Sequence, residues 1–170
     1  MNHLNAEADL RDVPLGTDFL FFLNEDAAGK FTRLATMQDQ FTMDASHSFS
    51  SRLDEVKLAE GKLLTTKPNL PKSQPELGRK EVLVKPETRG WRGDQQVKLA
   101  DLAAGDELLF NLAGKIADSP GWCSDIWIGA DTHKLASEQQ GEEVRRFYQE
   151  ARRAGLDRED RGQPAHDHVL

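Results

Sequence analysis

Aromatic and basic side chains gather in the second half of the sequence, where they could form one binding surface. They are Arg89, Trp91, Arg92, Trp122 and Trp127. Flat rings beside guanidinium groups are typical of a platform on which the bases of a single-stranded nucleic acid stack. A structural interpretation competes with this one: Trp127 alternates into a buried core, and Trp91 and Trp122 cover the ends of the fold.

The overall charge weighs against nucleic acid as the partner. The 170 residues carry a formal net charge of -7, which repels phosphate backbones and removes the usual electrostatic driving force for binding them. We therefore favour the structural interpretation and keep the nucleic-acid platform as the alternative. The expected partner is an unidentified protein or small molecule.

Residue types that bind metal ions are present but are not paired. They are Cys123, Asp125, Asp131, His133, His166 and His168. The sequence contains neither Cys-x-x-Cys nor His-x-x-x-His, which are the spacings expected of a zinc site. We predict no metal site and no cofactor.

The run Ser46-His47-Ser48 places a hydroxyl beside an imidazole, as a hydrolase with a serine nucleophile requires. Adjacent side chains rarely face one another, and the sequence has neither a nucleophile elbow nor a glycine-rich phosphate loop. Turn formation or helix capping is the interpretation we prefer, and the protein is predicted not to be an enzyme.

The sequence contains an internal repeat, from which the elements that position these residues can be predicted. Residues 10–23 align without gaps on residues 99–112, an offset of 89, with six identities in fourteen positions. Each copy reads as a short apolar segment, a glycine-centred turn and a strand. Asp12 and Asp101 are expected to accept hydrogen bonds from turn amides, while Gly16 and Gly105 supply a positive φ.

Strands and hairpins are expected after each turn. The first copy continues from 19–23 to 31–37, and the second continues through a turn at 118–121 to 123–128. Two more strand candidates, 61–67 and 80–85, precede the second copy and are separated by prolines, which cannot join a sheet ladder.

Helical spacing is weak at 37–45 and clear from about 137 to 154. In the second segment an apolar stripe is expected to pack on the protein's own barrel rather than on a partner. Its members are Val144, Phe147, Tyr148 and Ala151.

The sequence therefore predicts a mainly β fold: tandem small antiparallel β-barrel units of OB-like type, with a C-terminal amphipathic helix. The expected units are residues 1–58 and 59–156, followed by a disordered tail at 157–170. The first unit is predicted to be incomplete, because only nine residues precede Leu10. We expect the chain to be an N-terminally shortened piece of a larger protein, whose open sheet edge near residues 19–37 favours self-association.

The run from Glu87 to Leu108, which contains Leu99-Ala-Asp-Leu-Ala-Ala-Gly-Asp-Glu-Leu108, resembles a bacterial family of small β-barrels of unknown function. That family carries an "L.DL..GD.V" turn and strand signature. The resemblance covers roughly residues 60–130, with a weaker echo at 4–37, where Thr17 stands in place of the Asp after the glycine. It implies an OB-like or SH3-like closed sheet, usually in exported or envelope proteins, and no catalytic residues.

The N-terminus lacks the basic and apolar regions of a signal peptide, and no apolar run approaches the roughly 20 residues that span a bilayer. We expect a cytoplasmic protein if Met1 is the true start, and an exported or envelope protein if a leader precedes it. The predicted function is a non-catalytic binding or structural module. A single-stranded nucleic-acid module is the first alternative, and a small hydrolase using Ser46 and His47 is the second.

Overall fold

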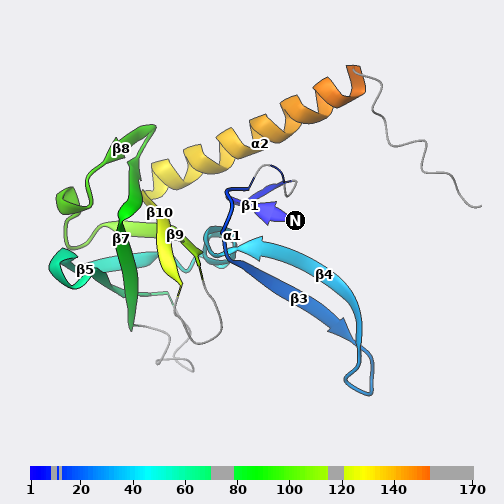
Figure 1. The fold of residues 1–170 in the computed structure, drawn as a ribbon, viewed down its shortest axis with the longest axis horizontal. Helices are drawn as coiled ribbons and strands as arrows, with labels where there is room; N and C mark the ends of the chain where they lie inside the picture. The colour runs from blue at the N-terminus through cyan, green and yellow to red at the C-terminus, as the bar shows by residue number, and fades with distance from the viewer. Residues whose placement is uncertain (9–10, 12, 70–78, 115–120, 154–170) are drawn as a thin grey trace, which may run out of the picture.

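Strands dominate the architecture (Figure 1). The computed structural model describes residues 1–8, 11, 13–69, 79–114 and 121–153. The strands form two sheets, and a long helix, α2 (Ala130–Arg153), follows the last strand. The predicted fold class is confirmed: the protein is mainly β, its two sheets fit tandem units, and a helix ends the described chain. The tail predicted at 157–170 lies outside the described residues.

Five strands close into a barrel. They are β5 (Ser51–Lys57), β6 (Lys62–Thr66), β7 (Arg79–Arg92), β9 (Glu107–Ala113) and β10 (Trp122–Ile128). Around the barrel the order is β5, β6, β7, β10, β9 and back to β5. Only β7 and β10 are parallel among these neighbours. This closed five-stranded sheet matches the predicted OB-like barrel.

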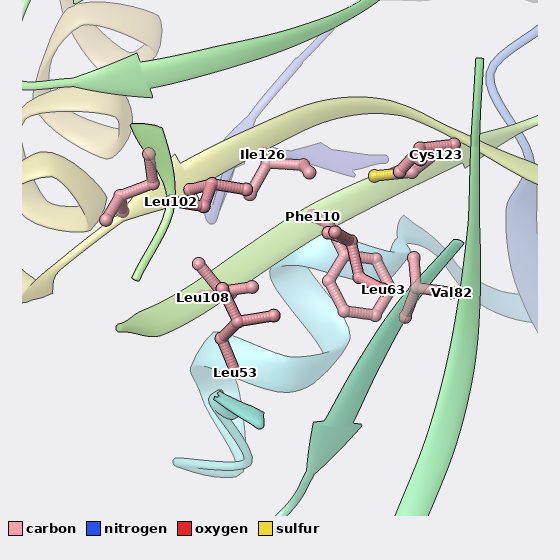
Figure 2. Packing of buried hydrophobic residues seen from close by; sticks show 10 residues of the cluster. Leu53, Leu63, Val82, Leu102, Leu108, Phe110, Cys123 and Ile126 are labelled. Carbon is pink, nitrogen blue, oxygen red and sulfur yellow. The ribbon is translucent and has the colours of Figure 1, made fainter. Parts of the chain in front are cut away.

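The inside of the barrel is filled by aliphatic side chains (Figure 2). On β9, Leu108 and Phe110 occupy alternate positions, so one face of the strand lines the core. Side chains from β5, β6 and β7 pack against them. The buried cluster is Leu53, Leu63, Val82, Val84, Leu102, Leu108, Phe110, Cys123, Ile126 and Ile128. Burying each large aliphatic side chain contributes roughly 1.5–3 kcal/mol.

Strand β7 runs past the predicted end at Lys85 because it accommodates Pro86 in a bulge. The Lys85 amide donates to Thr88 Oγ1 at 3.0 Å, and that hydroxyl donates to the carbonyl of Cys123 at 2.6 Å. Proline cannot donate to a ladder, so it is tolerated where the ladder is interrupted. At this interruption the Thr88 hydroxyl connects the backbones of β7 and β10 in place of a direct ladder hydrogen bond.

The N-terminal residues form a second, open sheet in the order β2-β1-β4-β3. Its strands are β1 (Asn2–His3), β2 (Ala6–Glu7), β3 (Phe19–Glu25) and β4 (Phe31–Asp39). The β3–β4 hairpin reaches away from the barrel (Figure 1). Its base joins the barrel, because Thr17 bridges to Ala113 and the Asp18 amide donates to the Leu112 carbonyl at 2.8 Å.

The internal repeat extends to the register of the hairpins. Four successive residue pairs of β3–β4 recur in β9–β10 with every residue 89 positions further along the chain. The pairs run from Phe19–Asp39 to Phe22–Thr36 in the first copy, and from Leu108–Ile128 to Asn111–Asp125 in the second. The β3–β4 hairpin is therefore the structural counterpart of β9–β10.

The same offset relates the strands beside the hairpins. Asn2 pairs in parallel with Gln38, and Trp91 pairs in parallel with Trp127. The β1–β2 hairpin likewise corresponds to the hairpin of β7 and β8 (Gln95–Val97). The first sheet thus repeats the last part of the barrel, and the strands described for it include no counterpart of β5 or β6.

Helix α1 (Gln40–Ser46) follows β4, and helix α2 follows β10. In each helix a threonine of the first turn contacts the turn of an earlier hairpin, which is β1–β2 for α1 and β7–β8 for α2. Thr42 Oγ1 accepts from the Asn5 amide at 2.9 Å, and Thr132 Oγ1 accepts from the Gly93 amide at 2.7 Å. Helix α2 consequently begins at Ala130, not near residue 137 as predicted.

A second apolar cluster lies on the outer face of the barrel. Phe41 of α1 meets Trp127 of β10 edge to face, with ring centroids 4.9 Å apart, and Leu109 and Ala136 complete the cluster. Trp127 is therefore a core residue, but it packs outside the barrel and not within it.

Of the stripe predicted on α2, Val144 is buried and Tyr148 is exposed. In the described part of the chain, single-turn 3-10 helices lie between β5 and β6 (η2, Leu58–Glu60) and between β8 and β9 (η4, Leu99–Asp101).

Candidate functional site

A cavity of about 720 Å³ lies where the outer face of the barrel meets the β1–β2 hairpin and the middle of α2. This volume falls within the range of small-molecule sites. We call it the α2 cavity. Its walls are His3, Leu4, Pro14, Thr17, Arg89, Trp91, Gly93, Asp94, Asn111, Ser124, Asp125, Trp127, Ala136, Gln139, Gln140, Glu142, Glu143 and Arg146.

A buried carboxylate, Asp39, holds one wall of the cavity in place. It ends β4 and caps α1, where its Oδ1 accepts from the Thr42 amide at 2.7 Å. Its Oδ2 accepts from His3 Nδ1 at 2.6 Å, from the Leu4 amide at 3.1 Å and from Asn111 Nδ2 at 2.9 Å. Four donors therefore fix the carboxylate, and with it the position of His3 at the cavity.

These bonds also set the protonation of Asp39. Burial alone raises the pKa of this carboxyl, but hydrogen bonds from His3 and Thr42 and the positive charge of His3 outweigh that effect. The pKa of Asp39 therefore lies below its ordinary value of 3.8. The group is an anion at neutral pH and serves as an acceptor.

Asn111 connects this carboxylate to the barrel. It lies on the outer face of β9, donates to Asp39 and accepts from the Phe41 amide at 2.9 Å through Oδ1. A single buried amide thus holds the start of α1, the end of β4 and a barrel strand together. Both the oxygen and the nitrogen of the amide therefore have a hydrogen-bond partner, as is usual for buried polar groups.

The opposite wall is built around a second carboxylate, Asp125. Arg89 donates to it through Nε at 2.8 Å and through Nη2 at 2.9 Å, and Trp91 Nε1 donates at 2.9 Å. The Arg89 guanidinium also lies over the Trp91 ring, 5.7 Å from its centroid. The charge of Arg89 is therefore already matched, and Trp91 offers the cavity its ring but not its N–H.

Helix α2 supplies the third wall, which contains an unsatisfied donor. Gln140 is only 5% exposed, and its Nε2 has no hydrogen-bond partner among the described residues. Gln140 lines the cavity together with Glu142, Glu143 and Arg146 of the same helix. A buried amide nitrogen without a partner carries a desolvation cost of about 1–3 kcal/mol.

The structure brings three of the five predicted binding residues together and separates two. Arg89, Trp91 and Trp127 all line the α2 cavity. Arg92 turns away and forms an ion pair with Asp106 at 3.1 Å. Trp122 begins β10, where the ammonium of Lys85 lies 4.5 Å from the centroid of its ring.

Among the predicted turn residues that the structure describes, Gly16, Asp101 and Gly105 are not lining residues of the cavity. Gly16 has φ of 87° and Gly105 has φ of 95°, values that glycine adopts without strain. In the second turn the carboxylate that accepts a turn amide is that of Asp106, which bonds to the Ala103 nitrogen at 2.9 Å. Asp101 instead ends the 3-10 helix η4, and Asp12 lies outside the described residues.

The Ser46 hydroxyl and the His47 ring do approach each other, at 3.0 Å, on the exposed end of α1. The same ring nitrogen, Nδ1, lies 2.9 Å from the Met43 carbonyl. A carbonyl oxygen can only accept, so Nδ1 carries the proton and cannot remove one from Ser46. The arrangement closes the helix end, as the preferred interpretation holds.

The potential metal ligands are dispersed. His133 Nε2 lies 2.8 Å from the Trp127 carbonyl, and burial lowers the pKa of this imidazole. Cys123 lies inside the barrel, where burial raises the pKa of its thiol well above the ordinary value. Among the described residues, no three ligand side chains come together around a common point. His166 and His168 lie outside them.

Comparisons with protein-family models, with curated proteins and with solved structures found no match. Within the described part of the chain, no helix combines the length and the apolar character needed to cross a membrane.

Sequence reasoning missed His3, Asp39, Asn111 and Gln140. Two of them carried local signals: Asn111 is a polar residue within the apolar strand 108–112, and Asp39 lies near the start of the segment 37–45 with weak helical spacing and is a residue type favoured as an N-cap. Nothing local marks His3 or Gln140. Their roles depend on partners in distant parts of the chain.

Proposed function

We propose that the protein is a non-catalytic binding module that takes a small molecule into the α2 cavity. The observation that carries the proposal is Gln140, a residue of the cavity wall whose buried Nε2 has no hydrogen-bond acceptor among the described residues. A buried donor of this kind needs an acceptor to offset its desolvation. A bound ligand with a carbonyl or similar oxygen provides one.

The other walls suggest the rest of the ligand. Trp91 and Trp127 present apolar ring surface, which favours a flat group. The cavity lining carries Arg146 beside the carboxylates of Asp94, Glu142 and Glu143, while Arg89 is paired with Asp125, so a strong anion is not favoured. A neutral or zwitterionic molecule with one ring and one amide-like oxygen fits these features.

The absence of catalysis is part of the proposal and is supported by how the carboxylates are used. Asp39 accepts from four donors and Asp125 from three. These bonds use both carboxylates to hold the walls of the cavity, and Ser46 and His47 lie on the exposed end of α1.

The test is a binding screen with aromatic amides, benzamide and indole-3-acetamide among them, followed by tryptophan fluorescence and ligand-observed NMR. Gln140→Leu should weaken binding about tenfold, because one hydrogen bond to the ligand is lost. The same variant should unfold at a higher temperature, since it removes a buried donor that has no partner.

Glu150→Gln is the matched control, because Glu150 is an exposed residue further along the same helix. It should change neither affinity nor unfolding temperature. The proposal is wrong if no member of the screen binds, or if Gln140→Leu binds every ligand as tightly as the parent chain.

A further inference from the structure

The β3–β4 hairpin carries an exposed apolar face. Phe21 and Leu23 of β3 are 60% and 53% exposed, and Phe31 and Leu34 of β4 are 54% and 47% exposed. Residues opposite one another in an antiparallel pair lie on the same side of the sheet, and Leu23 pairs with Leu34 and Phe21 with Met37. We call this surface the hairpin face. Exposed apolar patches of this kind mark interaction sites.

The 89-residue offset of the repeat identifies the residues of the barrel that correspond to the hairpin face. Phe21 matches Phe110 of β9, and Met37 matches Ile126 of β10, each 89 residues further on. Phe110 and Ile126 are 2% and 0% exposed, because they form the inside of the barrel. The hairpin face is therefore the counterpart of a closed barrel's interior.

The barrel shows which elements cover such a face. Leu53 of β5, Leu63 of β6 and Val82 of β7 pack against the counterparts of the hairpin face (Figure 2). Backbone bonds hold β5 at the edge of β9, where Ser51 pairs with Leu108. Among the described strands of the first sheet, β3 is the edge strand, so no described strand covers its outer edge, and its apolar side chains are exposed.

We propose that the hairpin face and the free edge of β3 accept an antiparallel pair of β-strands from another polypeptide. The fitting segment presents aliphatic side chains on its inner side, as Leu53 of β5 and Leu63 of β6 do, and charged side chains on its outer side. Main-chain hydrogen bonds to the edge supply affinity, and the inward side chains supply specificity. The occupant completes the interior that the barrel already shows.

A second copy of this hairpin fits less well than an aliphatic strand pair. It would bring Phe21 and Phe31 against the same bulky rings, where the barrel places Leu53, Leu63 and Val82, and oversized side chains strain a packed interior. Two chains of net charge -7 also repel one another. The size of these side chains and the net charge of the protein therefore favour a different polypeptide as the occupant.

The experiment uses the full chain and a fluorescent peptide of residues 51–66, which contains β5 and β6, as the probe. Anisotropy should show saturable binding, and amides of β3 should exchange more slowly when the peptide is bound. Phe21→Lys and Leu34→Lys should each weaken binding at least tenfold. Leu15→Lys alters an exposed leucine outside the hairpin and should leave binding unchanged.

A peptide with Leu53→Ser and Leu63→Ser should not bind. Binding that survives Phe21→Lys would mean that the peptide enters its own barrel, and it would overturn the proposal. No saturable binding would overturn it as well. So would a chain that sediments as a dimer and becomes a monomer with Phe21→Lys, because the second copy would then be the occupant.

Discussion

Asp39 holds more of the molecule together than any other described side chain. Its two oxygens join β1, the turn after β1, the start of α1 and, through Asn111, the barrel. A carboxylate buried this deeply is stable only because its donors replace the water it has lost. The stability of the whole fold should therefore respond to this one group.

The acid stability of the protein should depend on Asp39. Its pKa is lower in the folded chain than the ordinary 3.8, so the unfolded chain binds the proton more tightly. The stabilisation is fully present only well above the ordinary pKa of 3.8, and it is lost as the pH falls through the lowered pKa. Asp39→Asn should cost about 2 kcal/mol at pH 7 and less at pH 3.

Urea unfolding at pH 7 and pH 3 measures this difference. Glu150→Gln, an exposed carboxylate removed in the same way, should keep the parent's pH dependence. A loss of stability in Asp39→Asn that is equal at both pH values would show that packing, and not charge, is responsible.

At the scale of elements, each sheet joins its helix to the preceding β-turn by the same contact. Thr42 accepts from Asn5 in the first sheet, and Thr132 accepts from Gly93 in the barrel. Valine matches the shape of threonine but lacks the hydroxyl. Thr42→Val and Thr132→Val should each destabilise the protein by about 1 kcal/mol, because each leaves a turn amide without its acceptor.

Chemical denaturation of both variants and of the double variant tests this pair of contacts. Because the two sites are far apart in the chain and share no partner, their effects should add. Thr36→Val, a substitution on β4 away from either turn, is the control. An effect at only one site would mean that the two turn contacts are not equivalent.

Elements with a strong local pattern could be predicted from the sequence, and those that depend on distant partners could not. The repeat of Gly16 and Gly105 with the strands that follow predicted both hairpins. Strand β5 was not predicted, because Leu53 and Val56 lie three residues apart and do not alternate; pairing with β6 and β9 makes it a strand.

The candidate site divides in the same way. Arg89, Trp91 and Trp127 were grouped from their residue types as part of one possible binding surface, although the strands predicted near them covered only 80–85 and 123–128. His3 and Asp39 are 36 residues apart, and Asp39 and Asn111 are 72 apart. Single polar residues separated by such distances give no spacing signal, so only the fold reveals their contact.

For the whole molecule, the repeat predicts that the first sheet can be closed by design. Residues 51–90 fused directly before Asn2 place copies of β5, β6 and β7 ahead of β1, because Asn2 corresponds to Trp91. The fusion should bury Phe21 and Leu23, lower the binding of an apolar dye such as ANS, and raise the unfolding temperature.

The matched control carries Leu53→Ser and Leu63→Ser in the added segment only. It should bind the dye as strongly as the parent chain, because its strands cannot fill the interior. If the two fusions bind dye equally, the hairpin face does not accept these strands.

The end of β9 belongs to both sheets. Asn111 bonds to Asp39 and to the start of α1, and Leu112 and Ala113 pair with the chain just before β3. Neither sheet can open at this edge without breaking bonds that the other also uses. We therefore expect the two halves of the repeat to unfold together, with the β3–β4 hairpin held by the barrel, because an isolated two-stranded hairpin is at best marginally stable in water.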